Sequence, residues 1–218
     1  MASSDAQDDA ATETPAAAPR LALSQLGRVR RIVDAAIALA EAGGFEGVRL
    51  RDVADASGVA LGTLYKYFRS KEDVLLFAVN EDSAQLLRVV AERPPRSARA
   101  EERLVELFAR ATRGLTRRPS FARAALRAIA ASDASSAVQQ AAFHLRMTRM
   151  VVAALRDEAP DVATPLSEPS GSERERRIAL VLQNVWFASL VGWSSGLHPI
   201  GTVTQRVREA VELVLHGD

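Results

Sequence analysis

The stretch "GVALGTLYKYFRSK", residues 58–71, contains both tyrosines of the chain and its only two lysines. Because only 5% of the chain is aromatic, this concentration indicates that the segment has a specific role. Gly58 ends a preceding helical pattern, and Leu64 and Phe68 lie four positions apart, so they share one face of a second short helix. A short helix, a glycine turn and a second short helix form a helix-turn-helix, which is the layout predicted here.

The second helix of this motif has two different faces. We expect Leu64 and Phe68 to pack on Val53 and Ile32, on the side of the neighbouring helices. The outward side carries Leu61, Thr63, Tyr65, Lys66 and Tyr67. Aromatic rings with hydroxyl tips are costly to expose without a purpose, but they suit a surface that reaches the phosphates and sugars of DNA. The alternative is a half-buried tyrosine pair that binds nothing.

The residues on either side of the motif complete a three-helix arrangement. An apolar pattern at helical spacing covers residues 29–40 and ends at Gly43-Gly44, a pair typical of a helix C-terminus. A second short pattern covers residues 51–57. Ser70 precedes Asp73 by three positions, which is a capping box, so a further helix is predicted directly after Ser70.

Charge is distributed unevenly, although the net charge is only +1. Residues 1–19 carry four acids and no base, and residues 20–71 carry nine bases against five acids. The remainder is nearly neutral, with 19 bases against 18 acids. A basic excess around the motif is expected when a small module meets a polyanion, and a solvated charged face is the alternative explanation.

Composition excludes several other classes of protein. The chain has no cysteine, which excludes disulfides and thiolate metal sites, and its three histidines, His144, His198 and His216, lack the spacing of metal ligands. The longest apolar stretch, residues 178–193, is too short for a membrane span, and the N-terminus lacks the pattern of a signal peptide. We therefore expect a cytoplasmic protein with no metal, no cofactor and no membrane contact.

Residues 30–71, "RRIVDAAIALAEAGGFEGVRLRDVADASGVALGTLYKYFRSK", resemble the N-terminal domain of the TetR family of transcriptional regulators. The resemblance covers the helix before the motif, the Gly-Phe connection and the signature VAxxxGVxxGTLYxYFxSK. It implies that Arg51 reaches a base edge, and that Leu61 and Gly62 lie at the groove-facing start of the recognition helix. It also implies that Lys66 faces the groove or a phosphate, and that the DNA backbone is held by Thr63, Tyr65, Tyr67 and Lys71.

Two departures from the family pattern concern the starts of these helices. Many members carry a hydroxyl residue where this chain has Leu50 and Ala60. A missing side-chain cap costs about 1 kcal/mol per helix end. Gly62 also removes one base-reading side chain, so we expect specificity to depend on Arg51, Lys66 and DNA shape.

Beyond residue 71 the sequence is alanine-rich and helical. Breaks fall at Pro94-Pro95, around Pro119, near residues 132–133 and across residues 158–172, a loop long enough to be mobile. No alternating strand pattern competes, so about six further helices are expected. The predicted fold is all-α with about nine helices, an N-terminal helix-turn-helix domain followed by a C-terminal helical bundle.

The chain divides into three predicted parts. Residues 1–24 have no large apolar side chain between Met1 and Leu21, cannot offset their own ordering entropy, and are expected to form a disordered tail. Residues 25–71 form the DNA-binding domain, and residues 72–218 form the effector-binding and dimerisation domain.

Residues 173–197 predict how the chain assembles. After a charged start, "IALVLQNVWFASLVGW" is apolar on every side, so the helix must be covered all round. Pairing with a second subunit through this helix and the last one, residues 202–215, would cover it, and the alternative is the central helix of a monomeric bundle. A twofold dimer would read a palindromic operator in double-stranded DNA.

The larger domain contains candidates for an effector pocket. Apolar side chains with two amides are typical of small-molecule sites. The candidates are Phe121, Leu126, Phe143, Met147, Met150, Leu155, Gln183, Asn184, Phe187 and Trp193. Plain core is the alternative for residues of these types. The resemblance implies a small-molecule effector that shifts the spacing of two DNA-binding domains, and such a pocket suits an apolar or acyl-thioester compound that releases the DNA.

An enzymatic alternative depends on residues 192–196, "GWSSG", which match the nucleophile elbow G-x-S-x-G. That motif requires a strand before the serine and a helix after it, together with an acid and a histidine further along the chain. A helical apolar run precedes Ser194 instead, so a hydrolase is the disfavoured alternative and no catalytic residue is expected.

Overall fold

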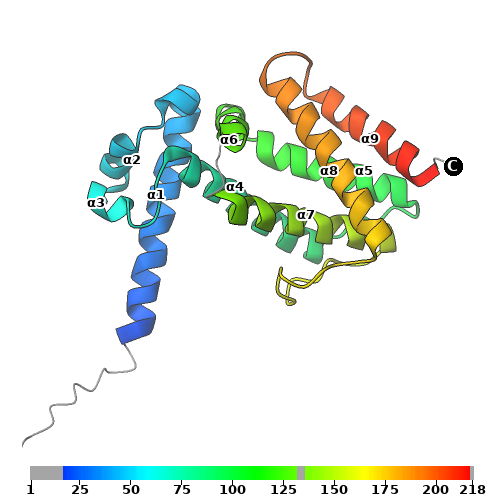
Figure 1. Cartoon of the computed structure of the whole chain (residues 1–218), viewed down its shortest axis with the longest axis horizontal. Helices are drawn as coiled ribbons and strands as arrows, with labels where there is room; N and C mark the ends of the chain where they lie inside the picture. Colours follow the sequence, from blue (N-terminus) through cyan, green and yellow to red (C-terminus); the bar gives the residue numbers. More distant parts are fainter. Residues whose placement is uncertain (1–16, 132–135, 217–218) are drawn as a thin grey trace, which may run out of the picture.

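The structure, a computed structural model, describes residues 17–131 and 136–216, with side chains from residue 24 onward. The elements assigned within these residues are all α-helices (Figure 1), which confirms the all-α prediction. The nine helices are α1 (Ala17–Gly47), α2 (Leu50–Ser57), α3 (Leu61–Leu64), α4 (Lys71–Glu92), α5 (Ala100–Thr116), α6 (Pro119–Ala131), α7 (Ala137–Arg156), α8 (Glu173–Ser194) and α9 (Gly201–His216).

Helix α1 begins at Ala17, within the stretch that was expected to form a tail, and residues 1–16 of that stretch lie outside the described part of the chain. The regular helix is interrupted at Gly44, where φ is 61° and ψ is −159°. Residues other than glycine rarely adopt this backbone conformation. The predicted helix end at Gly43-Gly44 therefore corresponds to a kink, after which the chain turns toward α2.

The helix-turn-helix is formed by α2 and α3, with Gly58 between them. Gly58 adopts the left-handed conformation, with φ of 65°, and its N–H faces the carbonyl oxygens of Ala54 and Asp55. Helix α3 is short, but the chain continues in helical turns, because the N–H groups of Tyr67 and Phe68 both donate to the carbonyl of Leu64.

The helix starts in this region agree with the capping pattern of the sequence. Neither Arg49, the N-cap of α2, nor Ala60, the N-cap of α3, makes a side-chain cap. Leu50 is the first residue of α2 rather than its cap. The predicted cap before α4 is present, since the Ser70 hydroxyl accepts the Asp73 N–H at 3.2 Å.

One hydrophobic cluster holds α2 and α3 against α1. Ile32, Val53, Leu64 and Phe68 all belong to it, and none is more than 3% exposed, as the spacing predicted. We call residues 25–71 the head and this cluster the head cluster. The cluster continues into α4 and α6, which contribute Val74, Leu75, Ala78, Phe121, Ala125 and Ala128. Helix α6 lies between α1 and the rest of the molecule (Figure 1) and completes the core of the head.

A second cluster occupies residues 72–218, which we call the body. This body cluster includes Leu104, Phe108, Met147, Met150, Leu182 and Trp186. Trp186 Nε1 donates a hydrogen bond of 2.9 Å to Thr112 Oγ1 within this cluster. No helix within residues 17–131 and 136–216 is long and apolar enough to cross a membrane.

The loop between α7 and α8 is long enough to be mobile, and in the structure hydrogen bonds anchor it to α7. The guanidinium of Arg149, only 5% exposed, donates to the carbonyls of Thr164 at 2.6 Å and Pro165 at 2.9 Å. At the end of the loop, Arg156 pairs with Glu175 in the first turn of α8.

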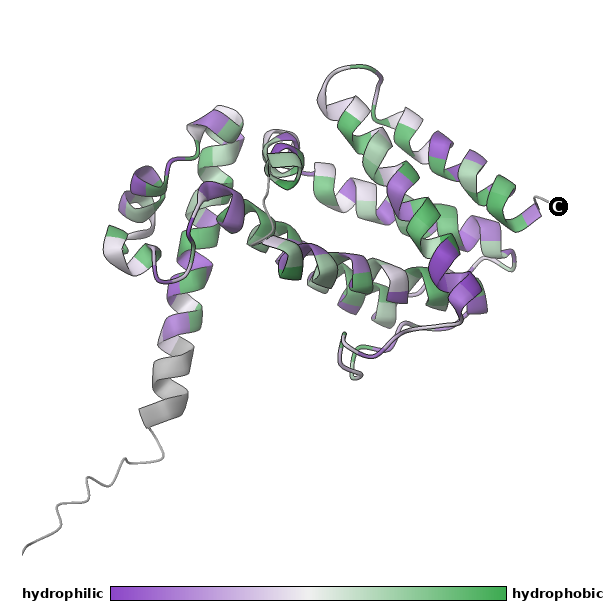
Figure 2. Cartoon of the chain, viewed as in Figure 1, coloured by the Kyte–Doolittle hydropathy of each residue, from purple (hydrophilic) through white to green (hydrophobic). Residues whose placement is uncertain are grey.

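Helix α8 changes from hydrophilic first turns to a largely apolar remainder (Figure 2), but the chain covers only part of it. Leu180 is 54% exposed, Val181 43% and Val191 39%. Asn184 and Ala188 are exposed as well. These five residues recur at helical spacing and form one face, which we call the α8 stripe. Within a single chain, α8 is therefore not the fully covered central helix of a bundle.

Candidate nucleic-acid interface

The outer face of α3 is fixed in position by its inner face. Leu64 is fully buried and Phe68 is 3% exposed, and both lie in the head cluster. On the opposite side, Tyr65 is 53% exposed and Lys66 is exposed. Tyr65 and Lys66 therefore place a phenol and an ammonium group in solvent on the side where the sequence predicts them.

The neighbours of Tyr65 are less exposed than expected. Leu61 and Tyr67 are partly buried and pack against the head cluster. Thr63 is partly buried too. A Cβ added at Gly62 would meet no other atom within 4 Å. The outer face of α3 therefore carries no side chain at Gly62, and the exposed side chains of Tyr65 and Lys66 follow on the same helix.

Arg51 lies in the first turn of α2 and is exposed, at the end of that helix nearest the connection to α1. Arg49, the N-cap of α2, and Arg69, which lies between α3 and α4, are both exposed. Neither Arg49 nor Arg69 was among the predicted site residues. The available signal was their position next to helix starts, where a backbone contact to DNA is usual.

Lys71 is engaged inside the molecule. Its Nζ donates to the carbonyl oxygen of Phe45 at 3.1 Å and lies 3.5 Å from Glu46 Oε2. The same atom lies 3.8 Å from the centroid of the Phe45 ring, a cation–π contact. Lys71 therefore joins the start of α4 to the corner between α1 and α2 in this conformation, whereas its contact with the DNA backbone remains a prediction.

The ten candidate pocket residues do not all lie around one space. Phe121 belongs to the head cluster, and Asn184 lies on the α8 stripe. Four candidates lie in the body cluster, namely Leu126, Met147, Met150 and Trp193. Three more are partly buried against it, namely Phe143, Leu155 and Phe187. Gln183 is buried, with its Oε1 2.8 Å from His144 Nδ1 and its Nε2 donating to Thr148 Oγ1 at 3.0 Å.

Comparison with known families agrees with this geometry. Residues 32–78 match the family described as bacterial regulatory proteins, tetR family, and residues 98–214 match the tetracyclin repressor-like C-terminal domain. The chain belongs to the TetR family. It is a helix-turn-helix transcriptional regulator.

Individual relatives cover most of this TetR-family chain. The HTH-type transcriptional repressor KstR of Rhodococcus jostii is 33% identical over 195 residues, which span 89% of this chain and 85% of the relative. A TetR transcriptional regulator from Rhodococcus sp. RHA1 superposes with a TM-score of 0.74 at 24% identity, over 89% of this chain and 98% of that one. The Thermus thermophilus FadR repressor in complex with lauroyl-CoA gives a TM-score of 0.62 at 21% identity, over 87% of this chain and 94% of that one.

The residues of the hydrolase alternative do not form a catalytic arrangement. The Ser194 hydroxyl donates to the carbonyl of Val191 at 2.8 Å, at the end of a helix rather than a strand. The ring nitrogens of His198 face Pro199 O and Arg206 instead of Ser194. Among the described residues, no group of three or more side chains could hold a metal ion.

Proposed function

We propose that this regulator is a cytoplasmic repressor that binds a palindromic operator as a homodimer and is released by an acyl-type effector. The observation that carries the proposal is the outer face of α3, where Tyr65 and Lys66 are exposed while Leu64 and Phe68 hold the backbone from behind. Because that backbone is fixed, little ordering entropy opposes contact with DNA.

The exposed groups suit complementary tasks on a duplex. The hydroxyl groups of Tyr65 and of the partly buried Tyr67 donate hydrogen bonds to phosphates, and Lys66 supplies charge near the groove. Arg51 extends from the start of α2 toward a base edge, where guanine offers two acceptors. The open space at Gly62 supports close approach of the α3 backbone to the DNA.

Dimerisation is supported by the α8 stripe. An exposed row of Leu180, Val181 and Val191 is unusual on a monomer, and Leu213 of α9 is 72% exposed. Two copies related by a twofold axis would cover these side chains with each other and present two heads to one duplex. The palindrome of the operator follows from that symmetry.

The effector class is inferred from chemistry and from relatives. The body contains a large apolar cluster, and a FadR repressor of the same fold has been solved with lauroyl-CoA. A long acyl thioester is apolar at one end and anionic at the other. It releases DNA if it binds more tightly to a conformation in which the two heads are wrongly spaced.

The test begins with selection of a duplex from a random DNA library by the wild-type protein. On that duplex, we expect Tyr65→Ala and Lys66→Ala to reduce retention in a gel shift. The salt slope should fall by about 0.9 for each phosphate that a variant no longer neutralises. Leu145→Ala, which removes a side chain 40% exposed on α7, is the control. Lauroyl-CoA should then release the wild-type protein. Equal retention of Tyr65→Ala and the wild type would contradict the proposal.

A further inference from the structure

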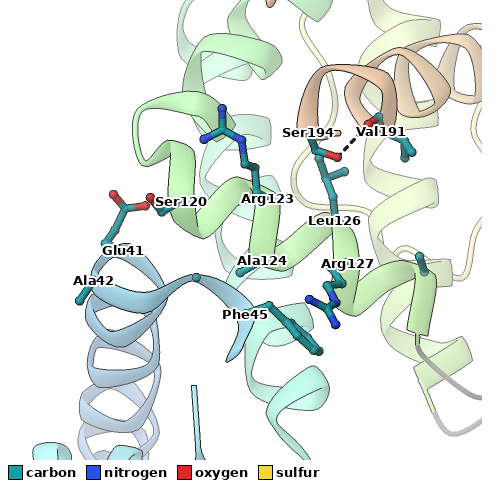
Figure 3. Close-up of a pocket in the computed structure, with 12 residues that line it drawn as sticks. Glu41, Ala42, Phe45, Ser120, Arg123, Ala124, Leu126, Arg127, Val191 and Ser194 are labelled. Atoms are coloured by element: carbon teal, nitrogen blue, oxygen red, sulfur yellow. Dashed lines mark hydrogen bonds between the residues drawn. The ribbon is translucent and has the colours of Figure 1, made fainter. Parts of the chain in front are cut away.

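The head and the body meet at a cleft that the function above does not use. It has a volume of about 490 Å³ and is formed by the end of α1, the length of α6 and the end of α8 (Figure 3). This volume is within the range of small-molecule sites. Leu126 lines the cleft and also belongs to the body cluster, so the cleft lies directly beside the apolar core.

Arg123 of α6 is an unpaired cation in this cleft. Its guanidinium lies over the ring of Trp193, 4.8 Å from the centroid. It is exposed, and it forms no ion pair with a carboxylate among the described residues. Stacking uses the face of the guanidinium and leaves its N–H edge for a ligand.

Arg127, one turn further along α6, points toward Phe45 (Figure 3) and connects the body to the head. It lies 2.7 Å from Glu46 Oε1 and 4.6 Å from the Phe45 ring centroid. Since Lys71 contacts the same two residues, the corner between α1 and α2 is held by one cation from α6 and one from α4. An anion in the cleft would compete with Glu46 for Arg127.

The acid that lines the cleft is already engaged. The Glu41 carboxylate accepts the N–H of Phe121 in the first turn of α6. The cleft therefore presents two arginines, one of them without an ion-pair partner, against one carboxylate with a hydrogen-bond partner, together with the apolar side chain of Leu126. These groups match a ligand with an anionic end and an apolar part.

We propose that this cleft binds the phosphate-bearing end of the acyl-coenzyme A effector, an inference that rests on the proposed function. Arg123 and Arg127 pair with the phosphates through charge-assisted hydrogen bonds. Leu126, which lines the cleft and belongs to the body cluster, offers an apolar surface to the acyl chain. Recruitment of Arg127 away from Glu46 loosens the contact between α6 and the head, which couples effector binding to the position of the recognition helix.

Calorimetric titration of the full-length protein tests the site. The probes are lauroyl-CoA, coenzyme A without the acyl chain, and laurate without the nucleotide. We expect Arg123→Gln to weaken binding of lauroyl-CoA and coenzyme A about tenfold, because it removes a charge-assisted hydrogen bond, and to leave laurate binding unchanged. Arg113→Gln, an exposed arginine of α5 outside the cleft, should bind all three like the wild type.

Two results would overturn the site: Arg123→Gln binding lauroyl-CoA as tightly as Arg113→Gln does, or a wild type that binds laurate as tightly as lauroyl-CoA and does not bind coenzyme A. Failure of the proposed function has a different signature, namely that lauroyl-CoA binds in an Arg123-dependent way but does not release the selected duplex. For the coupling step, Glu46→Gln should lower affinity for that duplex without ligand. Unchanged affinity and unchanged release in Glu46→Gln would exclude the coupling through Arg127.

Discussion

The head and the body are built from similar apolar residues, but they differ in how their structure is encoded. The head depends on residues with special conformations or caps, such as Gly58 in the left-handed region and Ser70 before α4. The body depends on long alanine-rich helices whose apolar side chains serve as core, surface stripe or cleft lining. A short motif is therefore sufficient to place the head, whereas tertiary packing decides the role of each body residue.

The two regions also share part of their cores. Phe143 of α7 packs against both clusters, and Phe121 of α6 lies in the head cluster although the helix belongs to the body. A boundary at residue 71 follows the DNA-binding motif, while the apolar core continues across it. Under the proposed function, this continuity would couple the effector site to α3.

The largest loss of stability is expected from a substitution of Phe121, which is fully buried in the head cluster. Phe121→Ala should lower the free energy of unfolding by about 3–5 kcal/mol, because it leaves a cavity in the head cluster. Met150→Ala, at a fully buried position of the body cluster, should cost about 2–5 kcal/mol. Urea denaturation measures both losses. Hydrogen exchange should rise in α1–α3 for the first variant only, and the same exchange pattern in both would break the distinction between the clusters.

A somewhat smaller effect is expected at the α8 stripe. Val181→Arg would place an unpaired charge in the proposed dimer interface, costing about 3–5 kcal/mol of association energy and yielding monomers. Val162→Arg, at a valine 55% exposed on the loop before α8, makes the same chemical change away from the stripe. Sedimentation velocity should show a monomer for the first variant and a dimer for the second. Identical species would contradict the interface.

Two glycines of the helix-turn-helix differ in what they do for the backbone of the head. Gly58→Ala should cost about 1–2 kcal/mol, because an alanine is strained at φ of 65°. Gly62→Ala should leave stability unchanged or raise it by up to about 1 kcal/mol, since α3 is helical there and the added methyl meets open space. Thermal unfolding compares the two variants. If Gly62→Ala destabilised the protein as much as Gly58→Ala does, the difference in backbone conformation between the two glycines would be contradicted.

The smallest expected effect lies in the anchored loop of the body. Hydrogen bonds from Arg156 hold the pKa of Glu175 at about 2, below its ordinary value of 4.5. The folded state therefore favours the carboxylate, and the stabilisation is complete above about pH 4.5 and lost as the pH falls toward 2. Glu175→Gln should be less stable than the wild type by under about 1 kcal/mol at pH 7, because the pair is partly exposed. In denaturation at pH 7, 5 and 3, a difference that did not shrink at pH 3 would exclude this ion pair as its source.

Much of the head was predictable because its signals are local. The glycine turn at Gly58, the cap at Ser70 and the buried pair Leu64 and Phe68 all follow from residue type and spacing. The intramolecular contacts of Lys71 were not predictable, because its partners Phe45 and Glu46 are brought close only by the turn between α1 and α2.

The body was predictable in outline but not in detail. Six helices, α4 to α9, are described there, and their ends near Pro94-Pro95, near Pro119 and across residues 158–172 follow from proline positions and periodicity, whereas the predicted break at residues 132–133 lies outside the described residues. A buried phenylalanine at helical spacing does not reveal which of two cores it enters, so Phe121 was grouped with a pocket although it packs in the head cluster. The cleft was not predictable because its cations, Arg123 and Arg127, resemble ordinary surface arginines in the sequence.

The most direct test of the DNA-binding face is hydrogen exchange with and without the selected duplex, read amide by amide. We expect protection from residue 49 to residue 71, strongest around Gly62 and Tyr65, and no direct protection along the α8 stripe, because dimerisation covers the stripe with or without DNA. Protection confined to α8 and α9, or none within α2 and α3, would contradict the assignment of α3 as the recognition helix.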